Sequence, residues 1–110
     1  MNENLDKSTF FPEVLQVVPT DNLQVYVYFN DGSVHLFDVK PLIKPGTVFE
    51  PLSDTAFFKD HLTVIGKTVA WDMTGDRDPY KCLDLDPFVL IDAPAVEDPL
   101  KEEFRGDLIA

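Results

Sequence analysis

The clearest hydrophobic pattern in the chain is an alternation of apolar and polar positions over residues 23–29. A period of two is typical of a β-strand that buries one face and exposes the other. One face carries Leu23, Val25, Val27 and Phe29, and the other carries Gln24, Tyr26 and Tyr28. The pattern therefore predicts a half-buried strand with Val25 and Val27 in the core.

Shorter apolar runs flank this strand on both sides. Residues 14–18 are rich in valine and end at Pro19, which favours a short strand that stops there because proline has no N–H to donate. Asp31 and Gly32 follow the alternating run, and this pair favours a hairpin turn. A third strand is predicted at residues 34–38, which completes an antiparallel meander.

The middle of the chain predicts one short helix. Prolines and a glycine interrupt residues 40–52, so regular structure there is limited to single turns. Ser53 or Asp54 is suited to cap the helix that follows. Because so short a helix is not stable alone, Phe57 or Phe58 is expected to dock it into the core.

Further short elements are predicted after this helix. Residues 61–65 and 68–71 alternate around a glycine turn, which predicts a second hairpin. Residues 82–85 predict one more strand. Asp86, followed by a proline, predicts the N-cap of a last helical turn that runs to Leu90.

These elements predict an α+β fold in two layers: an antiparallel β-meander of about three strands, a short helix, and a second β-hairpin or strand pair. Residues 1–12 are interpreted as an N-terminal arm, residues 13–92 as a single α+β domain, and residues 93–110 as an acidic C-terminal tail.

The tail contains a spacing that favours a short helix. Leu100, Phe104 and Leu108 recur every four residues, which places them on one stripe of a helix whose first turn tolerates Pro99. Such a helix is expected to dock on its own domain or on a neighbouring copy. The alternative is a frayed terminus in which the spacing arises by chance.

Charge and composition exclude several classes of function. The formal net charge of −11 opposes contact with a phosphate backbone, so no direct nucleic-acid binding is expected. No apolar run approaches the roughly 18 residues of a membrane-spanning helix. The single Cys82, interpreted as a small buried hydrophobic residue, and an N-terminus without secretory features predict a cytoplasmic protein.

The only loop with candidate metal chemistry follows Trp71. Asp72, Asp76 and Asp78 are candidate ligands, because carboxylate oxygens bind Ca²⁺ and Mg²⁺. The closing glutamate of a twelve-residue calcium loop is absent, so a solvated turn in which Arg77 pairs with neighbouring aspartates is favoured over a metal site.

Other catalytic signals are missing. The two histidines, His35 and His61, are interpreted as a surface group and a helix cap rather than as a dyad. The chain has no phosphate-binding glycine loop, no zinc-protease motif and no nucleophile elbow. The sequence therefore predicts no catalytic residue, no cofactor-binding residue and no cofactor.

Aromatic and apolar residues outside the predicted core are the candidates for a contact surface. Trp71 is included, although the fold predicts that most of its side chain is buried. The candidate interaction residues are Tyr26, Tyr28, Trp71, Arg77, Leu100, Phe104 and Leu108.

Several of these features together resemble the bacterial family known as domain of unknown function 2442. The resemblance extends over residues 11–92 and rests on Asp31-Gly32, Asp38, Gly46, Phe49-Glu50-Pro51-Leu52, Phe57-Phe58, Trp71, Asp86-Pro87 and Leu90. The loop after Trp71 departs from the family pattern, since residues 73–75 replace an Asn-Gly pair and residues 77–84 form an insertion. The resemblance implies an α+β domain, which some relatives join to a helix-turn-helix, and gene neighbourhoods of toxin–antitoxin or mobile-element type.

Three functions are compatible with the sequence. The leading hypothesis is a non-enzymatic protein-interaction or regulatory module, of which an antitoxin-like protein is one form, acting on a protein partner or by self-association through a sheet edge. The alternatives are a small metal-dependent hydrolase that uses the loop after Trp71, and an acidic mimic of nucleic acid. An enzyme requires carboxylates that converge in a pocket, and a mimic requires acids aligned on one ridge.

Overall fold

Two antiparallel sheets and a few short helices make up the computed structural model, which describes residues 11–100. The first sheet has the order β1-β2-β3-β7 and the second the order β4-β5-β6. The strands are β1 (Val14–Pro19), β2 (Gln24–Phe29), β3 (Val34–Asp38), β4 (Leu62–Ile65), β5 (Thr68–Trp71), β6 (Leu83–Asp84) and β7 (Ala95–Val96). The helices are η1 (Lys40–Leu42), η2 (Glu50–Ser53), α2 (Thr55–His61) and α3 (Pro87–Leu90).

The three-stranded meander predicted from the alternation is confirmed. Strand β2 pairs with β1 on one side and with β3 on the other, so that Val27 lies opposite both Val17 and His35. Val25 and Val27 are fully buried, as the pattern predicted. Gly32 adopts a positive φ of 88° in the hairpin turn, a conformation that glycine tolerates without strain.

Local sequence signals also position the helices. The Asp54 carboxylate accepts hydrogen bonds from the amides of Ala56 and Phe57, at 3.0 and 3.4 Å, and so caps α2. Phe58 is the side chain that docks this helix into the core. At α3, Asp86 accepts from the Phe88 amide at 2.9 Å, and a proline occupies the first turn.

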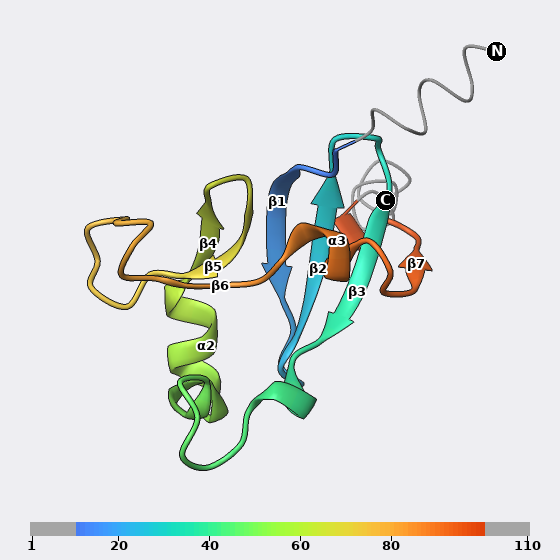
Figure 1. The fold of residues 1–110 in the computed structure, drawn as a ribbon. Helices are drawn as coiled ribbons and strands as arrows, with labels where there is room; N and C mark the ends of the chain where they lie inside the picture. The colour runs from blue at the N-terminus through green and yellow to red at the C-terminus, as the bar shows by residue number, and fades with distance from the viewer. Residues whose placement is uncertain (1–10, 101–110) are drawn as a thin grey trace, which may run out of the picture.

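The second hairpin packs beside the first sheet. Gly66 and Lys67 both have positive φ, as a two-residue turn between antiparallel strands requires. In Figure 1 the strands β1 to β3 stand in the centre, with the second sheet and α2 on one side and β7 on the other. A backbone hydrogen bond of 2.9 Å from Val14 to Lys67 joins the two sheets. The α+β fold predicted from the sequence is thus the fold observed.

One core lies between these layers. Its fully buried members come from both sheets, α2, α3 and the connections between them: Val25, Val27, Val39, Leu52, Phe58, Val69, Trp71 and Leu90. Within the described residues, none of the helices is both long and apolar enough to cross a membrane.

The short strand β7 was not predicted, because residues 93–110 were assigned to a tail. Val96 lies opposite Val34 and Ala95 opposite His35, so this part of the chain joins the first sheet as its last strand. The predicted helical stripe is described only at its start. Asp98 accepts from the Leu100 amide at 2.9 Å and the backbone at residues 99–100 is helical, whereas Phe104 and Leu108 lie outside the described residues.

Candidate functional site

The acidic loop after β5 is organised by its own carboxylates. Asp72 accepts hydrogen bonds from the amides of Gly75 and Arg77, both at 2.9 Å. Asp76 accepts from the Thr74 hydroxyl and, at 3.3 Å, from the Asp78 amide. The loop therefore closes on itself through side chain to backbone bonds of the kind that aspartates make in turns.

This arrangement does not assemble the candidate metal ligands. Asp78 accepts from the amide of Tyr80 at 2.9 Å, so all three candidate carboxylates bond to atoms of their own loop. Between residues 11 and 100, no three histidine, cysteine or acidic side chains lie close enough together to hold a metal ion. Asp72, Asp76 and Asp78 share a loop without forming a common site.

Arg77 reaches across to the second sheet, which corrects the prediction that it pairs with neighbouring aspartates. Its guanidinium donates to the Thr63 hydroxyl at 2.9 Å and to the Val64 carbonyl at 2.7 Å. Both acceptors lie on β4, which is an edge strand of its sheet. Arg77 thereby covers part of a strand edge that would otherwise expose backbone groups.

Cys82 and His61 show no sign of nucleophilic chemistry. The Cys82 side chain is half-buried, so the prediction that it is buried is wrong. Partial burial together with the Asp84 carboxylate raises the pKa of its thiol. A reactive cysteine needs the opposite shift. His61 stacks on Phe57 with ring centroids 4.0 Å apart, and its Nδ1 lies 2.8 Å from the Asp72 carbonyl, as expected of a group at a helix end.

Two predicted surface residues are buried. Trp71 is fully buried, its indole N–H donates to the Phe58 carbonyl at 3.2 Å, and its ring packs against that of Phe58. The burial prediction for Trp71 is confirmed, and its inclusion among the contact residues is wrong. His35 is only 8% exposed, because its position opposite Val27 places it on the core face of β3. Its interpretation as a surface group is therefore wrong.

His35 anchors the C-terminal part of the chain. Its Nδ1 lies 2.7 Å from the Ala93 carbonyl, and its Nε2 lies 3.1 Å from the Ser33 hydroxyl. That hydroxyl donates to Asp31 at 2.6 Å, a bond that lowers the pKa of the Asp31 carboxyl. The neighbouring Gly32 amide is bonded to the Phe29 carbonyl, so it is not available to stabilise an oxyanion. This set of bonds fixes a turn and a strand.

The residues that we call the edge segment, 93–98, run along the outer edge of β3. Besides the β7 pairing, the Leu36 amide donates to the Pro94 carbonyl at 3.0 Å. The Tyr28 hydroxyl donates to Asp98 at 2.6 Å, and burial together with this bond raises the pKa of the phenol. One candidate contact residue, Tyr28, is thus tied to the edge segment.

The sheet face that points away from the core carries two adjacent rows of uncharged side chains. Residues opposite each other in an antiparallel pair share a face, so Val18, Tyr26 and Leu36 form one row across three strands. The neighbouring row contains Gln16, Tyr28 and Val34. We call these six residues the outer face; Gln16 is exposed, Val34 is buried, and the other four are half-buried. The outer face brings Tyr26 and Tyr28 together. In the sequence, Leu100 comes two residues after Asp98, the hydrogen-bond partner of Tyr28.

Comparison with protein-family models shows the family to which the chain belongs. Residues 14–94 match the model described as "Protein of unknown function (DUF2442)". The chain belongs to this family. The match runs from the start of β1 to Pro94 and ends before β7, so family membership confirms the resemblance and does not assign a chemistry. Neither the curated proteins nor the solved structures with which the chain was compared gave a match.

Proposed function

We propose that this member of DUF2442 is a non-enzymatic protein-interaction module whose contact surface is the outer face of its first sheet. The observation that carries the proposal is two adjacent rows of uncharged side chains, with two tyrosines, on a chain with a net charge of −11. Asp38 and Asp98 border these rows. Removing water from charged groups costs free energy, so a partner covers an uncharged patch with a smaller desolvation penalty than it would a charged one.

The composition of the outer face suits a protein contact. Tyrosine is enriched at the energetic centres of interfaces, because its ring provides apolar area and its hydroxyl a hydrogen bond. Tyr26 lies between Val18 and Leu36, so a partner side chain placed over it would bury three apolar groups. The next row of the same face pairs Gln24 with Asp38, and the Asp38 carboxylate is paired with Lys40 at 2.9 Å.

The charge outside this face indicates the partner's chemistry. Carboxylates on the rest of the chain attract a basic surface and steer its approach. We therefore expect a protein partner with an apolar centre and a basic rim. An antitoxin-like role, in which a small acidic protein covers a basic one, is one form of this function, and regulation of another protein is a second.

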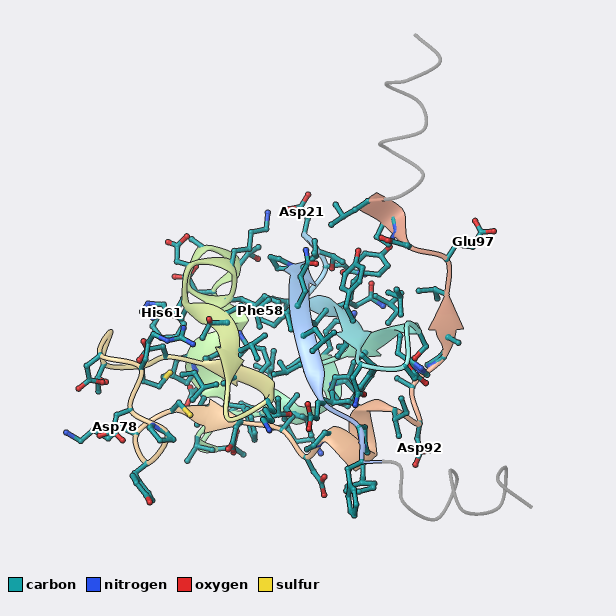
Figure 2. The ribbon with its side chains drawn as sticks, turned by 90° about the horizontal axis from the view of Figure 1, so that it is seen from above. Asp21, Phe58, His61, Asp78, Asp92 and Glu97 are labelled. Atoms are coloured by element: carbon teal, nitrogen blue, oxygen red, sulfur yellow. The ribbon has the colours of Figure 1, made fainter. Side chains whose placement is uncertain are left out.

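The two alternative functions have less support. A metal-dependent hydrolase would need the loop carboxylates, which bond to their own backbone. A mimic of nucleic acid would need a row of acids on one ridge. Figure 2 instead shows Asp21, Asp78, Asp92 and Glu97 on different sides of the domain.

A pair of charge-introducing variants tests the proposal. Tyr26→Asp places a carboxylate in the centre of the outer face, whereas Tyr80→Asp places the same charge on a loop residue that is 94% exposed and lies outside it. Cross-linked capture from the lysate of the native host is compared for the wild type and both variants. We expect a basic partner that the wild type and Tyr80→Asp retain and that Tyr26→Asp loses by tenfold or more.

Unfolding is the control for this experiment, so circular dichroism must show that Tyr26→Asp remains folded. Equal capture of the same partner by the three proteins would contradict the proposal. If the only protein captured is a second copy of this chain, the contact is self-association rather than binding of another protein.

A further inference from the structure

We infer that the outer edge of β3 is a strand-addition site for an extended segment of the partner, and that the edge segment occupies this site in the free protein. The inference rests on the proposed function, since it names how the partner would bind beside the outer face. Addition of a strand to a sheet edge is a common mode of peptide recognition, in which main-chain hydrogen bonds supply much of the affinity.

The built-in strand uses only part of the edge. Strand β3 is five residues long, whereas β7 is two residues long and pairs only with Val34 and His35. Beyond this pairing, Leu36 makes one bond to Pro94, and the chain then turns away into residues 91–93. The end of β3 toward Asp38 has no strand beside it on this edge within the described residues.

Pro94 leaves the pairing incomplete for a chemical reason. The Leu36 amide donates to the Pro94 carbonyl at 3.0 Å, but proline has no N–H to return to the Leu36 carbonyl. Any other residue at that place in an antiparallel strand would supply the missing donor. A partner segment without proline there can therefore form one more ladder bond than the edge segment does.

Surface hollows border the edge segment at both ends. A hollow of about 400 Å³ lies between it and the hairpin turn, lined by Ser33, Val34 and Val96 among others. A second hollow of about 410 Å³, bordered by Leu36, Val89 and Pro94, lies toward the other end of β3. A strand with space at both ends loses few contacts when it opens.

The pairing register of β7 with β3 indicates which residues a partner segment should carry at this edge. Ala95 is exposed and lies opposite His35, whereas the half-buried Val96 lies opposite Val34. The partner segment should therefore be extended and antiparallel to β3, and its residue opposite His35 is left open by the exposure of Ala95. Apolar residues should lie opposite Val34 and Leu36, on the side of the outer face.

A short strand with a nearby proline can also be a permanent cover that prevents strand addition. The two roles differ in how easily the segment opens. Amide hydrogen exchange of the full chain measures this, with Leu36 as the reporter of the edge and Val27, in the central strand, as the reporter of global unfolding. We expect Leu36 to exchange at least tenfold faster than Val27.

Two variants should move this exchange in opposite directions. Tyr28→Phe removes the bond to Asp98 and should accelerate Leu36 exchange by about threefold. Pro94→Ala supplies the missing N–H and should slow it by about fivefold. Val27 and Leu36 exchanging at one common rate in all three proteins would overturn the inference, because the edge would then open only when the domain unfolds.

A peptide probe tests the binding step. The probe is an acetylated peptide of residues 93–98 carrying the Pro94→Ala change, and its control is the same peptide with the natural proline. Added to the full-length Tyr28→Phe protein at millimolar concentration, the probe should shift the amide resonances of Val34, Leu36 and Asp38, and the control should bind several-fold more weakly. Equal binding of both peptides, or shifts confined to other strands, would overturn the inference.

The capture experiment separates this inference from the proposed function. If the edge is the binding site, Pro94→Ala should reduce partner capture, because it stabilises the built-in strand. A partner that Pro94→Ala retains in full and Tyr26→Asp loses would preserve the proposed function and overturn strand addition. If Tyr26→Asp captures the partner as well as the wild type while the probe binds β3, the outer-face proposal fails and the strand-addition site stands.

Discussion

The acidic loop at residues 72–81 and the edge segment at residues 93–98 are both polar connections, yet they are held in place in opposite ways. The hydrogen bonds of Asp72, Asp76 and Asp78 reach amides at most five residues away. Those of the edge segment join residues 58 and 70 positions apart in sequence. The loop carboxylates hold their turn through local bonds, to which Arg77 adds two bonds to β4, whereas the edge segment depends on a completed sheet.

This difference separates what each region can do. The loop carboxylates are engaged by their own backbone, so they give little to a ligand without unfolding the loop. The edge segment makes its bonds to a strand that other chains could also pair with. Of these two acidic regions, the edge segment is the one whose displacement would expose an unpaired strand edge, that of β3.

The largest expected effect comes from breaking the core that both regions share. Val27 is fully buried between Val17 and His35. Val27→Asp should lower the free energy of unfolding by more than about 4 kcal/mol, because it places an unpaired charge in the core. Urea denaturation measures the loss. A folded variant with a change below about 1 kcal/mol would mean that the two faces of β2 are wrongly assigned.

Local signals explain why most of the fold could be predicted from the sequence. The alternation around Val27 marks the buried face of β2, and Gly32 marks the turn that sets its pairing with β3. Asp54 and Asp86 cap helices with side chains that bond amides two or three residues ahead. Each of these features is complete within a few residues, so a sequence pattern contains it.

The features that could not be predicted depend on distant partners. Strand β7 is too short to show alternation, and its position follows from Val34 and His35, about sixty residues earlier. Trp71 is included among the contact residues by the sequence analysis, but the Phe58 carbonyl satisfies its N–H inside the core. The Arg77 side chain extends toward β4 from a backbone turn in which Arg77 itself has a positive φ, and no sequence motif indicates that turn.

The second prediction sharpens the comparison by loosening the loop alone. Asp72→Ala removes the acceptor for two amides and should cost about 1 kcal/mol of unfolding free energy, as the loss of a capping side chain does. The amides of Gly75 and Arg77 should exchange faster, while Leu36 exchange stays unchanged. This result would show that the acidic loop and the edge segment are energetically independent.

Glu97→Ala is the matched control for this experiment. It removes one carboxylate from the edge segment at an exposed position for which the described residues show no hydrogen bond. Its stability should stay within about 0.5 kcal/mol of the wild type. Faster Leu36 exchange in Asp72→Ala would contradict the comparison, because it would show that the loop supports the edge segment.

The smallest expected effect is a response to alkaline pH that is confined to the edge segment. The pKa of Tyr28 is raised from its ordinary value of 10.0, first by burial and then by the bond to Asp98. A group whose folded pKa is raised contributes stability below the unfolded pKa and loses it as pH increases beyond that value. Once the segment opens, the phenol regains its ordinary pKa, so opening becomes easier above pH 10 and is unaffected below about pH 9.

Tyr28→Phe isolates this contribution, because it keeps the ring and removes the hydroxyl. At neutral pH the wild type should be more stable than Tyr28→Phe by less than about 1 kcal/mol, since the phenol is partly solvated. This difference should shrink between pH 10 and 11. Thermal melting at a series of pH values, followed by circular dichroism, measures the gap. A gap that stays constant or widens above pH 10 would show that the Tyr28 hydroxyl does not hold the edge segment against the sheet.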